Sequence, residues 1–444
     1  MSRYSKEDII KLVSENEVKF ILLQFSDIFG VMKNVTITSD QLEMALDNKC
    51  MFDGSSIDGF VRIEESDMYL SPDYDTFLIF PWGSHNGKIA RLICDITTTD
   101  GKPFEGDPRY ILKQTVEKLS QMGYDYFNVG PECEFFMFHV DDKGEPTTIT
   151  QDNAGYFDLG PVDLGESARR DMCMMLENMG FEVEASHHEN APGQHEIDFK
   201  FKDALNVADC ILTFKQVVKT VAQRNGLYAT FMPKPISGVS GSGMHTNLSI
   251  SKQGCNIFYD ENDPLHMSQD AYWFMGGLLK YAREITAVTN PIVNSYKRLI
   301  TGYEAPVHIA WSAMNRSPLI RIPAVKDDST RIEYRSPDSS CNPYLALALI
   351  LNAGLEGIKN KIDPPQPVDK NIYNLSAETR TKLGIKTLPE NLKDAIDIMK
   401  ESQMVKEVLG EHIFDKYIEA KTNEWEDYRK VVTEWELGLY LNRY

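Results

Sequence analysis

Four short segments of the sequence place carboxylate, imidazole or guanidinium groups at spacings that could support chemistry. In the first, residues 130–138, Glu132 and Glu134 lie two positions apart among aromatic residues. Residues two apart on a strand share a face, so both carboxylates are expected on one side and Cys133 on the other. Two like charges in an apolar strand are costly to desolvate, and a bound dication removes that cost. A solvated sheet face is the alternative, which the neighbouring aromatic residues disfavour.

The second segment, residues 186–196, is rich in histidine and glutamate and runs into an expected strand. Glu189 and Glu196 flank a Pro-Gly turn that could bring both side chains toward one point. Such a loop is a candidate for metal binding. A polar surface loop is an equally good interpretation of this segment taken alone.

The third segment, residues 243–251, alternates polar and apolar side chains as a strand does. His245, Asn247 and Ser249 would share one face of that strand. A lone histidine on a strand is more often structural than a metal ligand. The glycine-rich entry to this strand favours a binding role, because glycine permits a ligand to approach the backbone closely.

The fourth segment, residues 329–335, would place Arg331, Glu333 and Arg335 on one face of a strand. A mixed-charge face of this kind is usually a surface ladder of ion pairs. Further arginines precede it, at Arg298, Arg316 and Arg321. The planar guanidinium group matches carboxylates and phosphates, so this concentration of arginines favours binding of such anions.

Together the four segments supply enough oxygen ligands for two cation sites. The candidate ligands are Glu132, Glu134, Glu189, Glu196, His245 and Glu333. Oxygen-dominated ligation favours Mg²⁺ or Mn²⁺ over zinc or copper. Dications and arginines are what phosphoryl transfer requires, because they neutralise charge and position the reacting groups. The sequence has no P-loop, no dinucleotide-binding fingerprint and no protein-kinase catalytic motif, so those enzyme classes are excluded.

Composition and charge fit a folded, acidic protein of more than one domain. The chain has 444 residues, of which 42% are hydrophobic and 25% charged, and its net charge is −20. An acidic surface repels phosphate backbones, so nucleic acid is not an expected partner. The seven cysteines are scattered singly, which predicts a reducing compartment. The N-terminus has no secretory signal and no apolar stretch is long enough to span a bilayer, so we expect a cytoplasmic protein.

The elements that must position these groups fall into two parts separated by a turn-rich stretch at residues 100–108. The first part, residues 1–104, is expected to be a small α+β domain with helices at 5–16 and 39–48 and strands at 19–25, 31–37, 76–80 and 89–96. The second part, residues 105–444, is expected to be a large α+β domain built on a curved sheet. Its expected strands are 126–139, 181–187, 194–201, 228–232, 243–251 and 331–335. Its expected helices are 109–122, 165–179, 203–225, 268–288 and 343–360, with helical structure over the last 55 residues.

Motifs in the same order along the chain resemble those of bacterial type I glutamine synthetases. The matching segments are 51–57, 130–136, 188–196, 234–245, 290–298, 303–306 and 316–323. The length of the chain resembles the shorter branch of this family, found in Gram-positive bacteria. The resemblance implies a β-grasp N-terminal domain followed by a catalytic domain with a curved antiparallel sheet. It also implies two stacked hexameric rings, with each active site between the N-terminal domain of one subunit and the catalytic domain of the next.

The resemblance further implies that ATP, L-glutamate and ammonium react to give L-glutamine, ADP and phosphate through γ-glutamyl phosphate. Two to three Mg²⁺ or Mn²⁺ ions would serve each site. The ligands of the ion that positions glutamate would be Glu134, Glu189 and Glu196. The ligands of the ion that bridges the ATP phosphates would be Glu132, His245 and Glu333.

Roles for the remaining site residues also follow from the resemblance. Glutamate would be bound by Arg298 with Ser240 and Gly241. The transferred phosphoryl group would be stabilised by Arg316 and Arg335, and the ATP phosphates by Arg321. The nucleotide pocket would be lined by Glu184, Phe201, Asn247 and Ser249.

Only the resemblance assigns a role to two further acids and one arginine. Asp53 would accept a proton from ammonium, and Glu304 would lie on a flap that covers glutamate and excludes water. By residue chemistry alone both would be turn-capping or surface charges. Arg62 resembles a residue of the shorter branch that mediates feedback inhibition by glutamine. Tyr373 resembles the tyrosine that is adenylylated in the longer branch, but we do not predict its modification.

The sequence departs from the family pattern at a few positions and leaves two other functions open. Ser240 stands where the family often has asparagine, and residues 339–341 replace a Pro-Ala-Ala-like run. A γ-glutamylpolyamine or γ-glutamylamide synthetase would keep the metals and ATP but replace the ammonium site. A catalytically inactive regulatory relative would lose ligands, whereas here all the candidates remain. Shorter-branch relatives also bind nitrogen-responsive regulators, so a regulator protein is a further possible partner.

Overall fold

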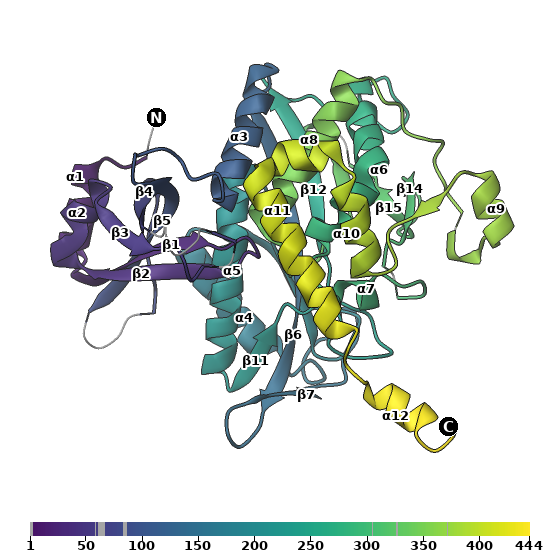
Figure 1. Ribbon diagram of the computed structural model, residues 1–444, viewed down its shortest axis with the longest axis horizontal. Coiled ribbons are helices and arrows are strands. Elements are labelled where there is room, and N and C mark those ends of the chain that lie inside the picture. Colours follow the sequence, from purple (N-terminus) through teal and green to yellow (C-terminus); the bar gives the residue numbers. More distant parts are fainter. Residues whose placement is uncertain are drawn as a thin grey trace.

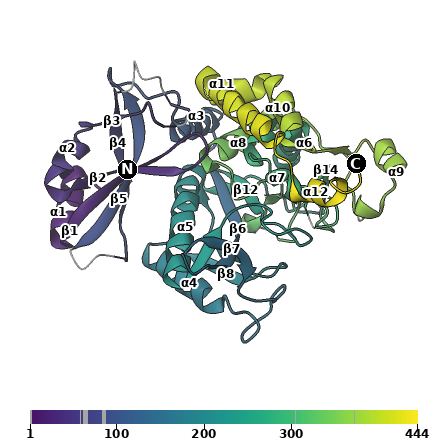
Figure 2. The same cartoon turned by 60° about the horizontal axis from the view of Figure 1, so that its bottom comes forward.

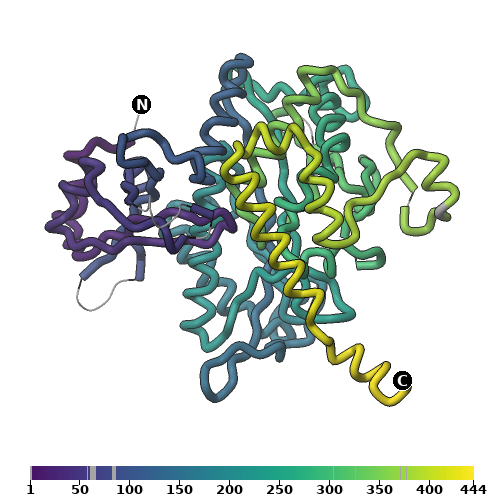
Figure 3. Tube along the Cα trace, in the orientation of Figure 1, coloured from purple at the N-terminus to yellow at the C-terminus, as the bar shows by residue number. Residues whose placement is uncertain are grey.

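Figure 1 shows the computed structural model of the protein, in which a small N-terminal sheet lies beside a larger part built on a second sheet. The structure describes residues 3–57, 59–60, 67–82, 87–303, 305–325, 327–370 and 372–444. The tube in Figure 3 follows the chain from the N-terminal sheet into the larger part and out to a C-terminal segment that projects from the body. Within these described ranges, no helix is both long enough and apolar enough to cross a membrane.

The N-terminal sheet has five strands in the order β2-β1-β5-β4-β3. They are β1 (Val18–Ser26), β2 (Met32–Thr38), β3 (Cys50–Asp53), β4 (Asp67–Ile79) and β5 (Lys88–Thr98). The β1 and β5 strands are parallel, and the other neighbouring pairs are antiparallel. Helix α1 (Lys6–Glu15) begins at a Ser5 capping box, which satisfies free backbone N–H groups at its start. Its buried residues Ile9 and Val13 join the core of this sheet together with α2 (Leu42–Leu46).

The second sheet contains twelve strands among the described residues, and its main path runs β17-β14-β15-β16-β12-β6-β9-β8. The strands on this path are β6 (Tyr126–Val140), β8 (Val183–His188), β9 (Gln194–Phe199), β12 (Met244–Lys252), β14 (His308–Ser312), β15 (Pro318–Arg321), β16 (Ile332–Tyr334) and β17 (Lys386–Thr387). Short strands β7 (Pro146–Thr150), β10 (Lys202–Asp203), β11 (Leu227–Thr230) and β13 (Cys255–Asn256) pair with β6 or β12. Only β14 and β15 run parallel among the neighbouring pairs on this path.

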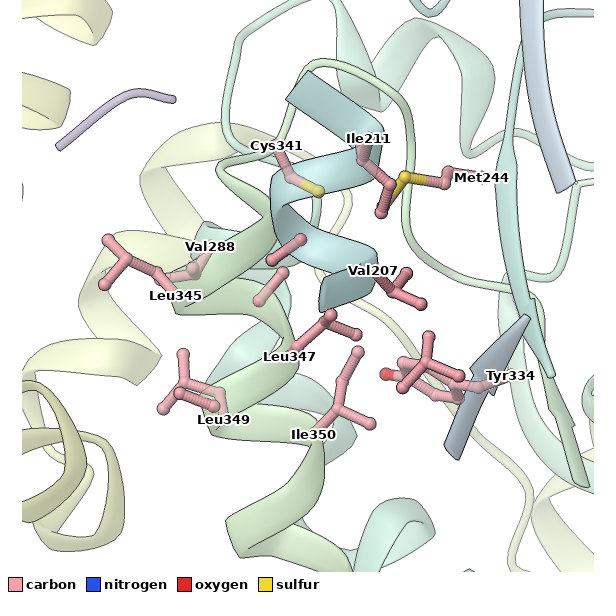
Figure 4. Close-up of a cluster of buried hydrophobic side chains, with 14 of the residues drawn as sticks. Val207, Ile211, Met244, Val288, Tyr334, Cys341, Leu345, Leu347, Leu349 and Ile350 are labelled. Carbon is pink, nitrogen blue, oxygen red and sulfur yellow. The ribbon is translucent and has the colours of Figure 1, made fainter. Parts of the chain in front are cut away.

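Helices cover one side of this sheet and form the main core. They are α3 (Pro108–Gln121), α4 (Glu166–Asn178), α5 (Ala204–Arg224), α6 (Gln269–Thr289), α8 (Pro343–Lys359), α10 (Leu392–Lys400) and α11 (Gln403–Tyr428). Shorter helices are α7 (Ser295–Arg298), α9 (Ala377–Lys382) and α12 (Glu434–Tyr440), of which α12 has no buried residue and projects from the body (Figure 1). In Figure 4, Leu347 and Ile350 of α8 lie on the side of that helix that faces Val207 of α5 and Tyr334 of the sheet. Helix α8 is apolar on nearly all sides because it is packed on all sides. It crosses α6 so closely that a Cβ added at Gly277 would lie 2.1 Å from the carbonyl oxygen of Ala353.

A buried cluster of charges joins the two sheets. Arg109, at the start of α3, pairs with Asp73 and Asp95 of the N-terminal sheet, both at 2.7 Å. The same guanidinium donates to Asp209 of α5 at 3.0 Å, and Asp209 also accepts from the Tyr344 hydroxyl of α8 at 2.6 Å. Because the Arg109 side chain is 3% exposed, these carboxylates compensate a charge that would otherwise be costly to bury.

The two-part α+β architecture and nearly all the expected elements are confirmed, with shifts of a few residues at their ends. The differences concern strands. Strand β3 was not predicted, and the strand expected at 76–80 is the end of the much longer β4. Strands β14 and β15 were not predicted, because their short runs of mixed residues lack a clear alternating pattern.

Candidate functional site

The polar residues predicted on separate strands meet across the second sheet. Glu132 of β6 is paired with His245 of β12 on one side and with Asp198 of β9 on the other. Glu134, two residues later on β6, is paired with Glu196 of β9. The intervening side chains turn the other way, into the core. The prediction that Glu132 and Glu134 share one face is therefore confirmed, and that face borders a pocket instead of open solvent.

These side chains line a pocket of about 310 Å³. All six candidate ligands and the four candidate arginines line it: Glu132, Glu134, Glu189, Glu196, His245, Glu333, Arg298, Arg316, Arg321 and Arg335. Ser240 and Gly241 also border it. The pocket thus gathers groups that are spread over more than two hundred positions of the sequence.

One half of the pocket is formed by Glu132, His245 and Glu333, whose ligand atoms lie within 4.8 Å of one another. Glu132 is 3.2 Å from Nδ1 of His245 and accepts from the Asn247 side chain at 2.8 Å. Burial raises the pKa of Glu132, but these hydrogen bonds outweigh it, so the pKa falls to about 2. Burial, and then the charge of Arg335, lower the pKa of His245. A neutral imidazole beside ionised carboxylates is the form that binds metal.

Glu333 is almost completely buried, with a side chain that is 1% exposed. Its two oxygens accept from Arg321 and Arg335. The interpretation of this strand as a surface ladder of ion pairs is therefore wrong. The ion pairs exist, but β16 lies between β15 and β12, so its polar face borders the pocket instead of solvent.

The other half is formed by Glu134, Glu189 and Glu196, which repel one another. Burial, and then the charge of Glu134, raise the pKa of Glu189 to about 7. Burial, and then the charges of Glu134 and Glu132, raise the pKa of Glu196 well above its usual value. Burial also raises the pKa of Glu134, which accepts from Gln194 at 2.8 Å. Two buried carboxyls and the half-buried Glu189, which resist ionisation together, provide the oxygen donors that a hard dication prefers.

The glutamate-binding candidates are held by close backbone packing. Both Nη atoms of Arg298 are anchored, one on the carbonyl of Ser336 at 2.8 Å and the other on that of Arg335 at 3.2 Å. A Cβ at Gly241 would lie 2.4 Å from the carbonyl oxygen of Pro233, so this position has no room for a side chain. The guanidinium of Arg298 is therefore fixed in place before any ligand binds.

A second pocket, of about 340 Å³, adjoins the first and shares Glu132 and Asp198 with it. The four residues expected to line the nucleotide site all border this pocket: Glu184, Phe201, Asn247 and Ser249. Arg331 also lies here and donates to Asn247 at 3.0 Å. Two adjoining pockets with shared carboxylates provide space for two substrates that meet at the acidic strands.

One described candidate, Asp53, lies away from these pockets. Asp53 ends β3 in the N-terminal sheet, is exposed, and lines neither pocket. Arg62 and Glu304 lie outside the described residues. The two pockets therefore contain the metal, phosphate and nucleotide candidates but not the ammonium candidate.

Sequence reasoning missed several residues that line the pocket. Asp198 lies two positions after Glu196 on β9, and burial, followed by the charge of Glu196, raises its pKa to about 9. The same two-residue spacing that drew attention to Glu132 could have identified it. Tyr156 also lines the pocket, where its hydroxyl interacts with Arg316 and its ring lies against His187. No local pattern marks Tyr156, because it lies in an irregular loop.

Comparison with known proteins identifies the family. The model of the glutamine synthetase β-grasp domain matches residues 17–99, and the model of the glutamine synthetase catalytic domain matches residues 105–440. The chain belongs to the glutamine synthetase family. A glutamine synthetase of Clostridium saccharobutylicum is 60% identical over 444 residues, covering all of both chains. A glutamine synthetase of Staphylococcus aureus is 56% identical over 441 residues, covering 99% of both. The resemblance drawn from the motifs is thus confirmed.

Solved structures share the fold over nearly the whole chain. A structure titled as a GmaS complex with ADP has a TM-score of 0.89 at 32% identity, covering 98% of this chain and 99% of the other. A cryo-EM structure of the Plasmodium falciparum glutamine synthetase has a TM-score of 0.87 at 27% identity, covering 99% of both. The much higher identity to glutamine synthetases of Gram-positive bacteria does not favour a γ-glutamylamide synthetase.

Proposed function

We propose that the two adjoining pockets form L-glutamine from L-glutamate, ammonia and ATP through γ-glutamyl phosphate. The chain is an enzyme of the glutamine synthetase family, which depends on ATP and a divalent metal and makes glutamine from glutamate and ammonia. The observation that carries the mechanism is the convergence of six candidate metal ligands and four arginines on one pocket beside a second, nucleotide-sized one.

In the first step, the γ-carboxylate of glutamate attacks the terminal phosphorus of ATP, forming γ-glutamyl phosphate and releasing ADP. Arg298, with Ser240 and Gly241, holds glutamate. The supporting observation is that the Arg298 guanidinium is already fixed by two backbone carbonyls. A preorganised cation loses little entropy when the substrate carboxylate arrives.

Three arginines carry the charge of the phosphates. Arg316 and Arg335 stabilise the transferred phosphoryl group, and Arg321 binds the ATP phosphates. The ion pairs from Glu333 to Arg321 and Arg335 support these roles, because they fix both guanidiniums on the wall of the first pocket. Such preorganised charge is the main contribution that a protein makes to phosphoryl transfer.

Two dication sites complete this arrangement. When bound, ions held by Glu134, Glu189 and Glu196 and by Glu132, His245 and Glu333 would neutralise the phosphates and hold the phosphoryl group in line for attack. The nearly all-oxygen donor set fits Mg²⁺ or Mn²⁺, and each active site would hold two to three such ions. The nucleotide lies in the second pocket, between the walls that carry Glu184 and Phe201 and the Asn247–Ser249 strand.

In the second step, ammonia attacks the acyl phosphate, and phosphate leaves. Asp53 takes the proton that converts ammonium to ammonia, and Glu304 lies on a flap that excludes water from the intermediate. Asp53 lines neither pocket of its own chain. This supports an assembly in which a neighbouring subunit supplies Asp53, as in two stacked hexameric rings with sites between subunits.

The remaining assignments concern organisation and control. The β-grasp domain comprises residues 1–104 and the catalytic domain residues 105–444, in keeping with family-model matches on either side of that boundary. Arg62 serves feedback inhibition by glutamine, and a nitrogen-regulator protein is a candidate partner. The enzyme acts in the cytoplasm.

The experiment that tests this proposal compares Glu134→Gln and Glu333→Gln with the unaltered enzyme. Both variants should assemble normally and lose Mg²⁺-dependent release of ADP, because each removes one ligand charge from a different site. Near-normal turnover in either variant would refute the ligand assignment. The same assay with putrescine or ethylamine in place of ammonium should give slower turnover, and faster turnover with an amine would overturn the choice of substrate.

A further inference from the structure

Behind the turn that carries Glu189 and Glu196 lies a buried polar network that does not line either pocket. Its central members are Asp152, His188 and His195, which are 6%, 0% and 0% exposed. His188 and His195 are paired across β8 and β9, and their side chains point away from the pocket that Glu196 faces. Figure 2 shows that α4, β7 and β8, which surround this network, lie together at one end of the second sheet.

Asp152 holds both ends of the turn. One of its oxygens accepts from Nε2 of His188 at 3.1 Å and from the backbone N–H of Gly193 at 3.0 Å. The other accepts from the backbone N–H of Leu164 at 3.2 Å. His188 in turn lies with Nδ1 2.7 Å from the carbonyl oxygen of Glu189. A carbonyl and a carboxylate both accept, so His188 donates through both ring nitrogens and ties the Glu189 backbone to Asp152.

Arg169 of α4 holds the second strand of the turn. Its Nη2 donates to Asp163 at 2.8 Å, and its Nη1 lies 2.9 Å from Nδ1 of His195. A guanidinium has no acceptor, so Nδ1 of His195 must accept and its Nε2 must carry the hydrogen. That Nε2 is 2.8 Å from the side-chain amide of Gln151. The atom of Gln151 at this distance is its amide nitrogen, so two donors would face each other. We therefore assign the amide with its oxygen and nitrogen exchanged, which gives the otherwise unpartnered oxygen a donor in His195.

Packing around the network leaves no freedom for the histidine rings. A Cβ added at Gly165, which precedes α4, would lie 2.5 Å from Cε1 of His195. Gly193 has a φ of +67°, and a Cβ there would lie 2.9 Å from the carbonyl oxygen of Met137. A side chain at either glycine would therefore collide with the neighbouring residue that packs against it.

A structural metal ion is the obvious alternative use for two histidines and an aspartate this close together. The hydrogen bonds exclude it. Both nitrogens of His195 are engaged by Arg169 and Gln151, and the guanidinium would lie beside any cation bound there. Both nitrogens of His188 donate, so neither offers a lone pair.

We propose that Asp152 and Arg169 are positioning residues that hold Glu189 and Glu196 in the geometry of the glutamate-side metal site. This inference rests on the proposed role of those two glutamates as ligands. Asp152 acts on Glu189 through His188. Arg169 acts on Glu196 through His195. Outer hydrogen-bond partners of this kind typically change metal affinity by about 10- to 100-fold when they are removed.

The test measures Mn²⁺ binding by electron paramagnetic resonance on the full-length, assembled enzyme, alongside hydrogen exchange of the 189–194 amides in the metal-free protein. Asp152→Asn keeps the shape of the side chain but removes its charge. It should weaken one class of Mn²⁺ sites about 10- to 100-fold, leave the other class unchanged and speed amide exchange in the turn. Gln151→Leu, a milder change, should weaken the same class by a smaller factor and serves if Asp152→Asn does not fold.

Asp209→Asn is the matched control, because Asp209 is 5% exposed and belongs to the charge cluster between the sheets. It should lower the thermal midpoint without changing Mn²⁺ affinity. If Asp152→Asn only lowers the midpoint in the same way, or weakens both classes of site equally, the positioning role is refuted. If Glu134→Gln retains both classes of site, the ligand assignment itself fails. If Glu134→Gln loses one class and neither network variant weakens that class, only the positioning inference fails.

Discussion

Metal binding should release protons and become tighter as the pH rises, because carboxyls in the metal-free pocket hold protons near neutral pH. Burial, and then the charge of Glu134, raise the pKa of Glu189 from 4.5 to about 7, and the same two causes raise the pKa of Glu196 well above its usual value. A carboxyl must lose its proton to bind a dication. At pH 7 binding should therefore displace about half a proton from Glu189, in addition to any proton held by Glu196.

The same pKa shift fixes the sign of a stability effect. The folded, metal-free protein holds the Glu189 proton more tightly than the unfolded chain does. The stability this contributes is fully present below pH 4.5 and is lost as the pH rises through 7. For a shift of about 2.5 pKa units the loss is about 3 kcal/mol. A bound dication offsets this loss, so the increase in thermal midpoint caused by saturating Mg²⁺ should be larger at pH 8 than at pH 6.

Calorimetric titration with Mg²⁺ in two buffers of different ionisation enthalpy measures the released protons directly. Thermal unfolding with and without Mg²⁺ at the two pH values measures the stability effect. Glu189→Gln is the matched control, since it should release about half a proton less at pH 7. Proton release of zero at pH 7, or a midpoint shift that is equal or larger at pH 6, would refute the reasoning.

Two further predictions concern packing and substrate binding. Gly277→Ala should lower the free energy of unfolding by about 1–3 kcal/mol or more, because its Cβ would clash with the Ala353 carbonyl. Gly438→Ala is the control and should leave this free energy unchanged, because its Cβ would meet nothing within 4 Å. Equal thermal midpoints for the two variants would contradict the close crossing of α6 and α8. Arg298→Lys should raise the KM for glutamate roughly 10- to 150-fold, the equivalent of about 1.5–3 kcal/mol, because lysine cannot keep both carbonyl anchors and a forked contact with the substrate. The KM for ATP should not change in steady-state kinetics, and a parallel rise in both constants would argue against this role.

The sequence predicted best those features that depend only on residues close together in the chain. That Glu132 and Glu134 share a face depends only on the two-residue period of a strand, and the structure confirms it. That Glu333 is buried depends on which strands flank β16, and these are supplied by segments far away in the sequence. A strand with mixed charges has the same local pattern at the protein surface and beside a buried pocket, and that pattern favoured the surface.

Other residues had no physical signal of their own. Tyr156 reaches the pocket from an irregular loop, and only the fold brings it beside Arg316. Asp53 was assigned from family motifs, and in the structure it is an exposed residue at the end of β3. The role of such a residue depends on what lies opposite it in the assembled enzyme, which the chemistry of one side chain does not determine.

The dispersal of the ligands along the chain has a consequence for how the enzyme is made. Glu132 lies on the first long strand of the catalytic sheet, whereas Glu333 lies on β16, which enters the sheet some 200 residues later. At about 5–20 residues per second, a ribosome needs about 10–40 s to cover that distance. The ligands of one proposed site, Glu134, Glu189 and Glu196, are all present after residue 196, but the other site lacks Glu333 until the end of this interval. A chain that terminates before Glu333 therefore lacks one of the two cation sites and also Arg335, which pairs with Glu333, so the order of synthesis leaves such a chain without a complete phosphoryl-transfer centre.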